Sequence, residues 1–354
     1  MQQTNRYEWW KYPLIRKILF LSYTHYPMKR VLKFLGIILG SVVLAIACVF
    51  TYIGTAFPKV KAASAMKIVA TSEMLKRGYY LANYVCLCVD CHSERDFTKY
   101  GGPLVPGTIG QGGEVFDHSM SFPGTFYARN ITPYNLGSWT DGEIYRAITT
   151  GVDKEGKPLF PVMPYQNYGK LDTNDIKAVI AYIRTLPAVK NDIPKSKADF
   201  PMNFIMNTIP GEATPQSIPS KNDMVAYGRY IATAASCTDC HTKQNNGKYI
   251  GELFAGNFEF RMPDGSIIRS ANITPDKETG IGTWTKEIFV AKFKMYADSN
   301  YHAPTVKTGQ TNTIMPWDNY SGMDTSDLTA LFAYLQTIEP VKQQVIRYSS
   351  PGEK

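Results

Sequence analysis

Two short cysteine motifs limit what this chain can fold into more than any other feature of the sequence. Cys88-x-x-Cys91-His92 returns as Cys237-x-x-Cys240-His241. This spacing is typical of a covalently bound c-type haem, in which both thiols bond to the porphyrin and the histidine ligates its iron. A thioredoxin site would need a βαβ context, and a zinc ribbon would need closely spaced cysteine pairs; the sequence has neither. We therefore expect two covalently bound haem c groups.

The first motif contains an irregularity. A glycine lies nine residues before Cys237 but ten residues before Cys88, so one residue has been added where Cys86 stands. Cys86 would also fit a wider attachment motif. We expect Cys88 to bind the haem, because it reproduces the spacing of the second copy. Cys86 is then either an inert buried thiol or a reactive exposed one.

The chain beyond residue 70 is one unit that occurs twice, here called repeat 1 and repeat 2. Six blocks recur in the same order: a Gly-containing aromatic segment, the cysteine motif, Asn-Ile-Thr-Pro, Gly-x-Trp-Thr, Met-Pro-aromatic and Asp-Thr-x-Asp. They begin in repeat 1 at Arg77, Cys88, Asn130, Gly137, Met163 and Asp172, and in repeat 2 at Tyr227, Cys237, Asn272, Gly282, Met315 and Asp324. Six blocks in one order indicate a duplication.

Each repeat is expected to contain three helical segments joined by long loops. The segments span about residues 72–85, 140–151 and 172–183 in repeat 1, and 222–235, 285–298 and 324–335 in repeat 2. Apolar residues of the last segments follow helical spacing, prolines end them, and strand signals are weak. Gly78 and Gly228 are expected where two helices cross closely. A haem would supply the apolar centre that such loop-rich units lack, so the sequence predicts an all-α fold with long haem-wrapping loops.

A six-coordinate haem iron needs a second axial ligand. Met163 and Met315 occupy the same place in the two repeats, each followed by proline and an aromatic residue. A single methionine is more often core filler, but the recurrence favours ligation of iron opposite the motif histidines. His118 and His302 are the alternative ligands. Neither has a counterpart in the other repeat, and we expect both on surface loops.

Two further residue types recur in the loops before the second helix of each repeat. Asn130 and Asn272 carry amide donors, and Trp139 and Trp284 carry indole N–H donors. Such donors tune a haem by bonding its propionates or its axial ligands, so we count all four as haem-binding candidates. The alternative is that the asparagines cap loops and the tryptophans belong to the core.

The basic residues concentrate near the N-terminus. The net charge is +8, and residues 1–61 hold nine Lys/Arg against one acidic residue, which leaves the remainder formally neutral. Residues 34–57 form an uncharged apolar run, long enough to cross a membrane as a helix. The positive charge before this run predicts a cytoplasmic N-terminus and residues 59–354 outside. We therefore attribute the excess of basic residues to interaction with a membrane, and we expect no nucleic-acid binding.

A cleaved signal peptide is the alternative to this anchor. Ala63-Ser64-Ala65 could serve as a cleavage site, although the apolar run is long for a signal core. Cys48 lacks a convincing lipobox, which disfavours lipoprotein processing. An uncleaved anchor would deliver both cysteine motifs to the outer side of a bacterial cytoplasmic membrane, where haem is attached.

Together these residues make the chain similar to class I cytochromes c, and more closely to the c-type cytochrome subunits of membrane-bound alcohol and gluconate dehydrogenases. The resemblance covers residues 72–341 and rests on the recurring blocks. It implies iron ligation by His92 with Met163 and by His241 with Met315. That family typically carries three haems and a C-terminal anchor, whereas this chain has two motifs and an N-terminal apolar run, so the particular dehydrogenase is not carried over.

The expected organisation has six parts. These are a cytoplasmic tail at 1–27, a transmembrane anchor at 28–58, cytochrome c domains at 59–190 and 221–345, a Pro-rich connector at 191–220 and a tail at 346–354. We expect a single-pass protein of the bacterial inner membrane with periplasmic haem domains that relays single electrons and is itself no enzyme. Its redox partners would be a dehydrogenase, quinol-oxidising complex, oxidase or soluble cytochrome, in a membrane complex. A dihaem peroxidase and a structural subunit are the alternatives.

Overall fold

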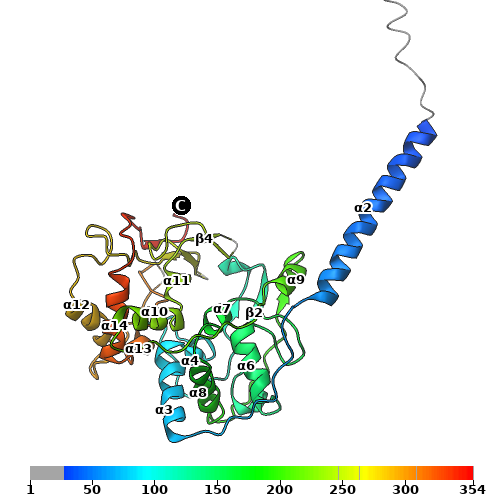
Figure 1. Cartoon of the computed structure of the whole chain (residues 1–354). Helices are drawn as coiled ribbons and strands as arrows, with labels where there is room; N and C mark the ends of the chain where they lie inside the picture. Colours follow the sequence, from blue (N-terminus) through cyan, green and yellow to red (C-terminus); the bar gives the residue numbers. More distant parts are fainter. Residues whose placement is uncertain (1–27, 246, 263, 308, 354) are drawn as a thin grey trace, which may run out of the picture. The chain divides into compact units, whose positions relative to one another are not determined.

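The computed structural model describes residues 28–353 except 246, 263 and 308 (Figure 1). It divides into two units, Met1–Thr55 and Ala56–Lys354. The predicted tail at 1–27 lies outside the described residues. Helix α2 (Met28–Ala56), which ends at the boundary between the two units, has 29 residues, a mean hydropathy of 2.6 and no buried residue. By length and composition α2 could cross a membrane, a test that an N-terminal signal sequence also passes.

In the second unit most helices of repeat 1 have a counterpart in repeat 2 (Figure 1). Repeat 1 contains α3 (Ser72–Tyr80), η2 (Leu81–Val85), α4 (Cys88–Cys91), η3 (His118–Met120), α5 (Pro133–Leu136), α6 (Asp141–Thr150), α7 (Tyr165–Tyr168) and α8 (Thr173–Ile183). The connector contains α9 (Met202–Ile205) and η4 (Met206–Thr208). Repeat 2 contains α10 (Met224–Ala234), α11 (Cys237–Cys240), α12 (Lys286–Lys294), α13 (Trp317–Tyr320) and α14 (Thr325–Leu335).

The first and last long helices of each repeat cross at a glycine. A Cβ on Gly78 of α3 would lie 1.9 Å from the Ala178 carbonyl oxygen of α8, and a Cβ on Gly228 would lie 1.9 Å from that of Ala330. Only glycine allows two backbones to approach so closely. The expectation that these glycines serve helix crossing is confirmed.

The second helix of repeat 1 begins where its sequence predicts. Thr140 and Glu143 form a capping box, in which the Thr140 hydroxyl accepts from the Glu143 N–H and the Glu143 carboxylate accepts from the Thr140 N–H. The helix ends at Gly151, whose φ of 73° lies in the left-handed region. Local signals therefore mark both ends of α6.

The all-α prediction holds only in part, because short strands pair within the loops. One sheet joins β1 (Val115–Phe116), β2 (Gly124–Tyr127) and β3 (Lys197–Ala198), a second joins β4 (Gln244–Asn245) and β5 (Lys248–Tyr249), and a third joins β6 (Glu259–Arg261), β7 (Ile267–Arg269) and β8 (Tyr348–Ser349). All pairings are antiparallel. Strands of two to four residues are too short to leave an alternating pattern in the sequence.

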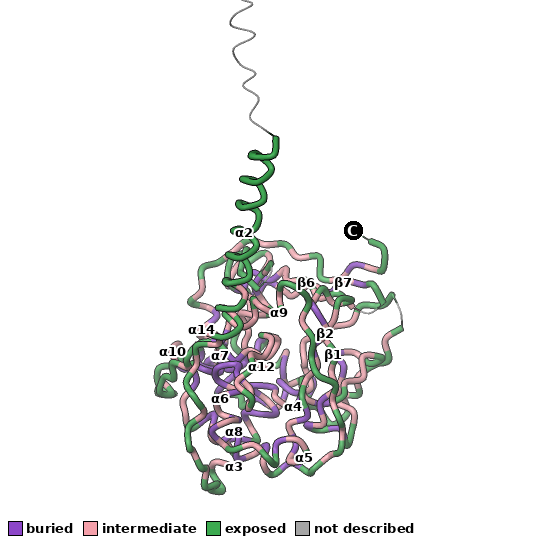
Figure 2. Tube along the Cα trace, turned by 90° about the vertical axis from the view of Figure 1, so that its right-hand side faces the viewer, coloured by how far each residue is buried: buried purple, intermediate pink, exposed green. Residues whose placement is uncertain are grey.

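A continuous apolar interior runs through both repeats. It includes Leu81 and Val85 of repeat 1 and Ile231 and Leu335 of repeat 2, all at most 1% exposed. Figure 2 shows buried stretches around α6 and α8. Residues 56–354 thus form one compact unit, and the division into two cytochrome domains at the boundaries given above stays a prediction.

Candidate haem sites

The two cysteine motifs adopt the same local structure. The segments α4 and α11 are single helical turns, and each is entered through a left-handed residue, Leu87 with φ 54° and Ser236 with φ 52°. In each turn the histidine N–H donates to the carbonyl of the first cysteine, at 3.1 Å for His92 and 2.9 Å for His241. Residues three apart lie on one side of a helical turn, so both thiols of each motif point the same way.

The added residue of repeat 1 is absorbed in a π-helix. The Cys86 N–H donates to the Leu81 carbonyl, five residues back, at 2.7 Å. A π-helical turn accommodates one extra residue without disturbing the helix on either side. Repeat 2 has the ordinary helix α10 at the corresponding place. The irregular spacing in the sequence therefore has a structural counterpart immediately before the motif.

Cys86 takes the place that Ala235 holds in repeat 2. The Tyr168 hydroxyl donates to the Cys86 carbonyl at 2.6 Å, and the equivalent Tyr320 hydroxyl donates to the Ala235 carbonyl at 2.9 Å. Cys86 is 6% exposed, and burial raises the pKa of its thiol well above the ordinary value. Of the two roles left open, the structure gives Cys86 that of a buried, unreactive thiol.

Each motif histidine is oriented by a backbone carbonyl. Nδ1 of His92 lies 2.6 Å from the Arg129 oxygen, and Nδ1 of His241 lies 2.8 Å from the Ala271 oxygen. A carbonyl can only accept, so Nδ1 carries the proton and Nε2 has its lone pair free for a metal. Burial lowers the pKa of both imidazoles against the opposing effect of this hydrogen bond, which favours the neutral ring that ligates iron. The sequence did not reveal these carbonyls.

The residues that follow the two carbonyls are Asn130 and Asn272. Each asparagine is buried, and its side-chain oxygen accepts from the N–H and the hydroxyl of the threonine two residues on. Its amide donates to a backbone carbonyl after the last helix, Val189 at 2.9 Å or Val341 at 2.7 Å. These contacts lock the loop that orients the histidine. Direct haem contact by either asparagine stays a prediction, because both amides have protein partners.

The two candidate methionines lie in matching loops. Met163 and Met315 are half-buried against the apolar interior. Each carbonyl accepts from the N–H two residues on, Tyr165 or Trp317, at 2.8 Å. The intervening proline has nearly the same φ in both loops, −78° and −80°. The two sulfurs are therefore presented by the same backbone conformation.

The remaining candidates are less distinctive. Trp139 and Trp284 are half-buried and pack against the interior, and within the part of the chain that the structure describes neither indole N–H has a protein acceptor. Their haem contact stays a prediction. His118 is exposed and pairs with Asp199 at 2.6 Å, and His302 is exposed on a loop. Both alternative ligands thus lie on the surface.

This donor set fits haem c. Each repeat offers two thiols on one helical turn, a neutral histidine with its Nε2 free and a methionine in a fixed loop. Among the described residues there is no group of three His, Cys, Asp or Glu side chains that could hold a bare metal ion. An iron that brings four porphyrin nitrogens needs only two protein ligands, and ligation by the histidine and the methionine of each repeat stays a prediction.

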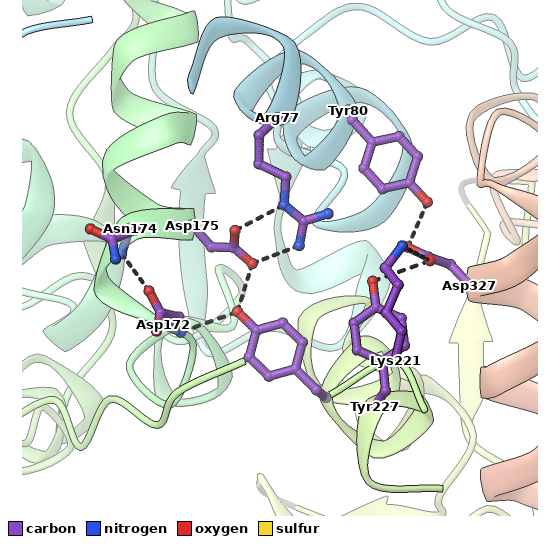
Figure 3. A network of polar contacts seen from close by, with 9 residues as sticks. Arg77, Tyr80, Asp172, Asn174, Asp175, Lys221, Tyr227 and Asp327 are labelled. Atoms are coloured by element: carbon purple, nitrogen blue, oxygen red, sulfur yellow. Dashed lines mark hydrogen bonds and ion pairs between the residues drawn. The ribbon is translucent and has the colours of Figure 1, made fainter. Parts of the chain in front are cut away.

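A polar network that the sequence analysis missed joins the two repeats (Figure 3). The Tyr80 hydroxyl of repeat 1 donates to Asp327 of repeat 2 at 2.9 Å, and the equivalent Tyr230 hydroxyl donates to Asp175 of repeat 1 at 2.7 Å. Each hydroxyl also accepts a backbone N–H at the start of the other repeat's last helix. Burial and then the nearby carboxylate raise the pKa of both tyrosines. The sequence signal that could have revealed this network is the recurrence of Tyr and Asp at equivalent positions of the two repeats.

A positive charge completes each half of this network. The Arg77 guanidinium binds both Asp175 oxygens, at 2.9 and 2.7 Å. The Lys221 ammonium lies 3.3 Å from the fully buried Asp327, which also accepts from the Tyr227 hydroxyl at 3.1 Å. Each carboxylate therefore has a cationic side chain beside it in the interface.

A family model matches part of the chain. Residues 225–339, which make up most of repeat 2, match the family model for cytochrome c. The chain thus contains a cytochrome c domain, and this family carries covalently bound haem c. The recurrence of every block extends the likeness to repeat 1.

Individual relatives refine this result. The fructose dehydrogenase cytochrome subunit of Gluconobacter japonicus is 28% identical over 292 residues, which cover 76% of this chain and 53% of the relative. The cytochrome c subunit of the quinone-dependent alcohol dehydrogenase of Gluconacetobacter polyoxogenes is 25% identical over 289 residues, 77% of this chain and 57% of the relative. A dihaem c-type cytochrome of Cereibacter sphaeroides is 27% identical over 168 residues, 45% of this chain and 54% of the relative. The chain spans about half the length of these relatives.

Proposed function

We propose that this protein is a dihaem cytochrome c that relays single electrons as a subunit of a dehydrogenase complex. The observation that carries the proposal is the recurrence of one complete cradle: thiol turn, carbonyl-bound histidine and methionine loop, each at the same place in both repeats. Similarity to cytochrome subunits of fructose and alcohol dehydrogenases supports the role as an electron-transfer subunit. The electron donor, the acceptor and the complex are part of the proposal.

The residues would act by holding and tuning the haems. Cys88 with Cys91, and Cys237 with Cys240, would bond to the porphyrins, while His92 with Met163 and His241 with Met315 would ligate the two irons. The haem supplies reversible one-electron chemistry when bound. The Arg129 and Ala271 carbonyls fix each imidazole and increase its basicity through Nδ1. Two filled axial positions would leave no site for a substrate, which argues against a peroxidase.

Membrane attachment belongs to the same proposal. Helix α2 would anchor the chain in the bacterial inner membrane with the N-terminus in the cytoplasm and both repeats in the periplasm. Its length and hydropathy support this role. Periplasmic repeats would meet the dehydrogenase on the side where haem attachment occurs.

Purification of the full chain from membranes in mild detergent tests the proposal. Two haems per polypeptide, six-coordinate spectra in both oxidation states and a co-purifying dehydrogenase are the expected results. A high-spin haem that turns over peroxide would overturn the electron-relay role, and a single haem per chain would overturn the dihaem assignment. A cytosolic distribution after cell fractionation would contradict the anchor.

A further inference from the structure

The methionine loop of repeat 1 makes a direct bond to the thiol turn of repeat 2. Asn167 lies in α7, four residues after Met163. Its amide nitrogen lies 2.8 Å from an Asp239 carboxylate oxygen and 3.2 Å from the Ser236 hydroxyl. Asp239 stands between the two cysteines of the second motif, and Ser236 immediately precedes them. The bond thus ends inside the segment that would hold the haem of repeat 2.

The rest of the route between the two sites is short and ordered. The Asn167 N–H donates to the Pro164 carbonyl at 2.9 Å, which returns the chain to the residue that follows Met163. On the other side, the Tyr249 hydroxyl donates to the second Asp239 oxygen at 2.5 Å, so both oxygens of that carboxylate are held. Each step from the methionine to the thiol turn is a covalent bond or a hydrogen bond of ordinary length.

The equivalent residue of the other repeat does not make this connection. Asn319, four residues after Met315, donates to the Asn83 carbonyl at 3.2 Å. Asn83 lies in the π-helix η2, five residues before Cys88, and not between the two thiols. Both methionine loops therefore reach across the interface with an asparagine side chain. Asn167 bonds to the thiol turn of repeat 2, whereas Asn319 bonds to the helix before the thiol turn of repeat 1. This difference provides a matched internal control.

Other contacts besides those of Asn167 hold the two repeats together. The reciprocal Tyr80–Asp327 and Tyr230–Asp175 pairs, together with the shared apolar interior, already hold the repeats together. Two direct hydrogen bonds from one half-buried amide add modestly to that stability. What distinguishes these two hydrogen bonds is that they end in the thiol turn of repeat 2.

We propose that Asn167 is a positioning residue for electron transfer between the two haems, linking the axial ligand loop of one haem to the attachment turn of the other. The inference rests on the proposed dihaem function. The step itself oxidises one iron from Fe(II) to Fe(III) and reduces the other from Fe(III) to Fe(II), with no bond made or broken and no proton exchanged. Electron transfer weakens steeply across unbridged gaps, so a hydrogen-bonded contact at this point favours it.

The test compares Asn167→Leu with Asn319→Leu in the full, haem-loaded chain in detergent. Haem content, axial ligation and both reduction potentials are measured first, because a chain without two six-coordinate haems would refute the proposed function instead of this inference. Pulse radiolysis then delivers less than one electron per molecule, and absorbance follows its redistribution between the haems. Asn167→Ala is the second variant if leucine prevents folding.

Asn167→Leu is expected to slow the redistribution severalfold at unchanged potentials, because it removes both hydrogen bonds to the thiol turn of repeat 2. Asn319→Leu is expected to leave the rate close to that of the parent protein, because Asn319 bonds to a carbonyl outside the thiol turn. A parent-like rate in Asn167→Leu, or equal slowing in both variants, would overturn the assignment. Equal slowing would mean that general packing of the interface controls the rate.

Discussion

Replacing Gly78 with alanine would force apart the helices that support the first thiol turn. The added Cβ would lie 1.9 Å from the Ala178 carbonyl oxygen and 2.8 Å from Cβ of Tyr182. Ordinary contact begins near 3.4 Å, so α3 and α8 must separate by about 1.5 Å at this point. A gap of about 0.5–1 Å already forfeits between a quarter and a half of the dispersion attraction across a contact.

The magnitude follows from two opposing effects. Overpacking costs about 1–3 kcal/mol, and the obstacle here is backbone, which cannot rotate away, so the upper end of that range applies. Alanine favours the helix over glycine by about 1 kcal/mol. The net loss in free energy of unfolding is about 2 kcal/mol, which lowers the unfolding midpoint by about 4–8 °C.

Thermal unfolding of the haem-loaded chain, followed by circular dichroism, measures the effect. Gly228→Ala is the matched variant in repeat 2, where the Cβ would lie 1.9 Å from the Ala330 oxygen, and a similar loss is expected. Gly211→Ala is the control, since no heavy atom lies within 4 Å of its Cβ, and it should change stability by less than about 0.5 kcal/mol. Equal midpoints for Gly78→Ala and Gly211→Ala would refute the crossing argument.

The other predictions concern the haem cradles. Cys86→Ala should leave covalent haem content unchanged because alanine fills the same place in repeat 2, whereas Cys88→Ala should remove one thioether bond; mass spectrometry of haem peptides distinguishes the two. Met163→Ala should lower the potential of one haem and Met315→Ala that of the other, since each removes a thioether ligand; a redox titration with both potentials unchanged would exclude these ligands. Asn130→Ala should reduce the free energy of unfolding by about 1–3 kcal/mol, measured by denaturant titration, and an unchanged value would show that its loop is not locked by the amide.

Features set by neighbouring residues were predictable from the sequence. The capping box at Thr140, the helix spacing after Asp172 and the glycines at the crossings all depend on side chains within a few positions or on the duplicated pattern. The duplication was especially informative, because a residue type that recurs at one position in both repeats points to a shared physical requirement. This reasoning gave the correct role for Gly78 and Gly228.

Features set by backbone or by distant partners were not predictable. The carbonyls that orient the histidines belong to Arg129 and Ala271. Only their backbone takes part, so the two side chains can differ and leave no shared sequence signal. The strands β1 to β8 depend on pairings between loops. The Tyr80–Asp327 pair joins residues far apart in sequence, although the same two residue types recur in the other repeat. An added residue before Cys88 was visible, but its absorption by a π-helix required the three-dimensional structure.

One difference between the repeats lies where they meet, and under the proposed function it would bear on the direction of electron flow. Two identical haem sites would have the same reduction potential, so electron transfer between them would have no preferred direction. The cradles themselves are nearly identical, but their surroundings are not. Arg95 of repeat 1, almost fully buried, pairs with Asp90 between the two thiols at 3.2 Å, and the equivalent residue of repeat 2 is the neutral Gln244.

The Arg95 side chain also reaches the other repeat. Its guanidinium donates to the Gly101 carbonyl at 2.8 Å and approaches the carbonyl of Ile314, the residue before Met315, at 3.4 Å. A buried charge acts strongly on a nearby redox centre because the surrounding dielectric is low. The same duplication that supplies two haem cradles thus leaves them in different electrostatic settings. Under the proposed relay function, this difference would give the two haems different potentials and so give the electron a preferred order of transfer.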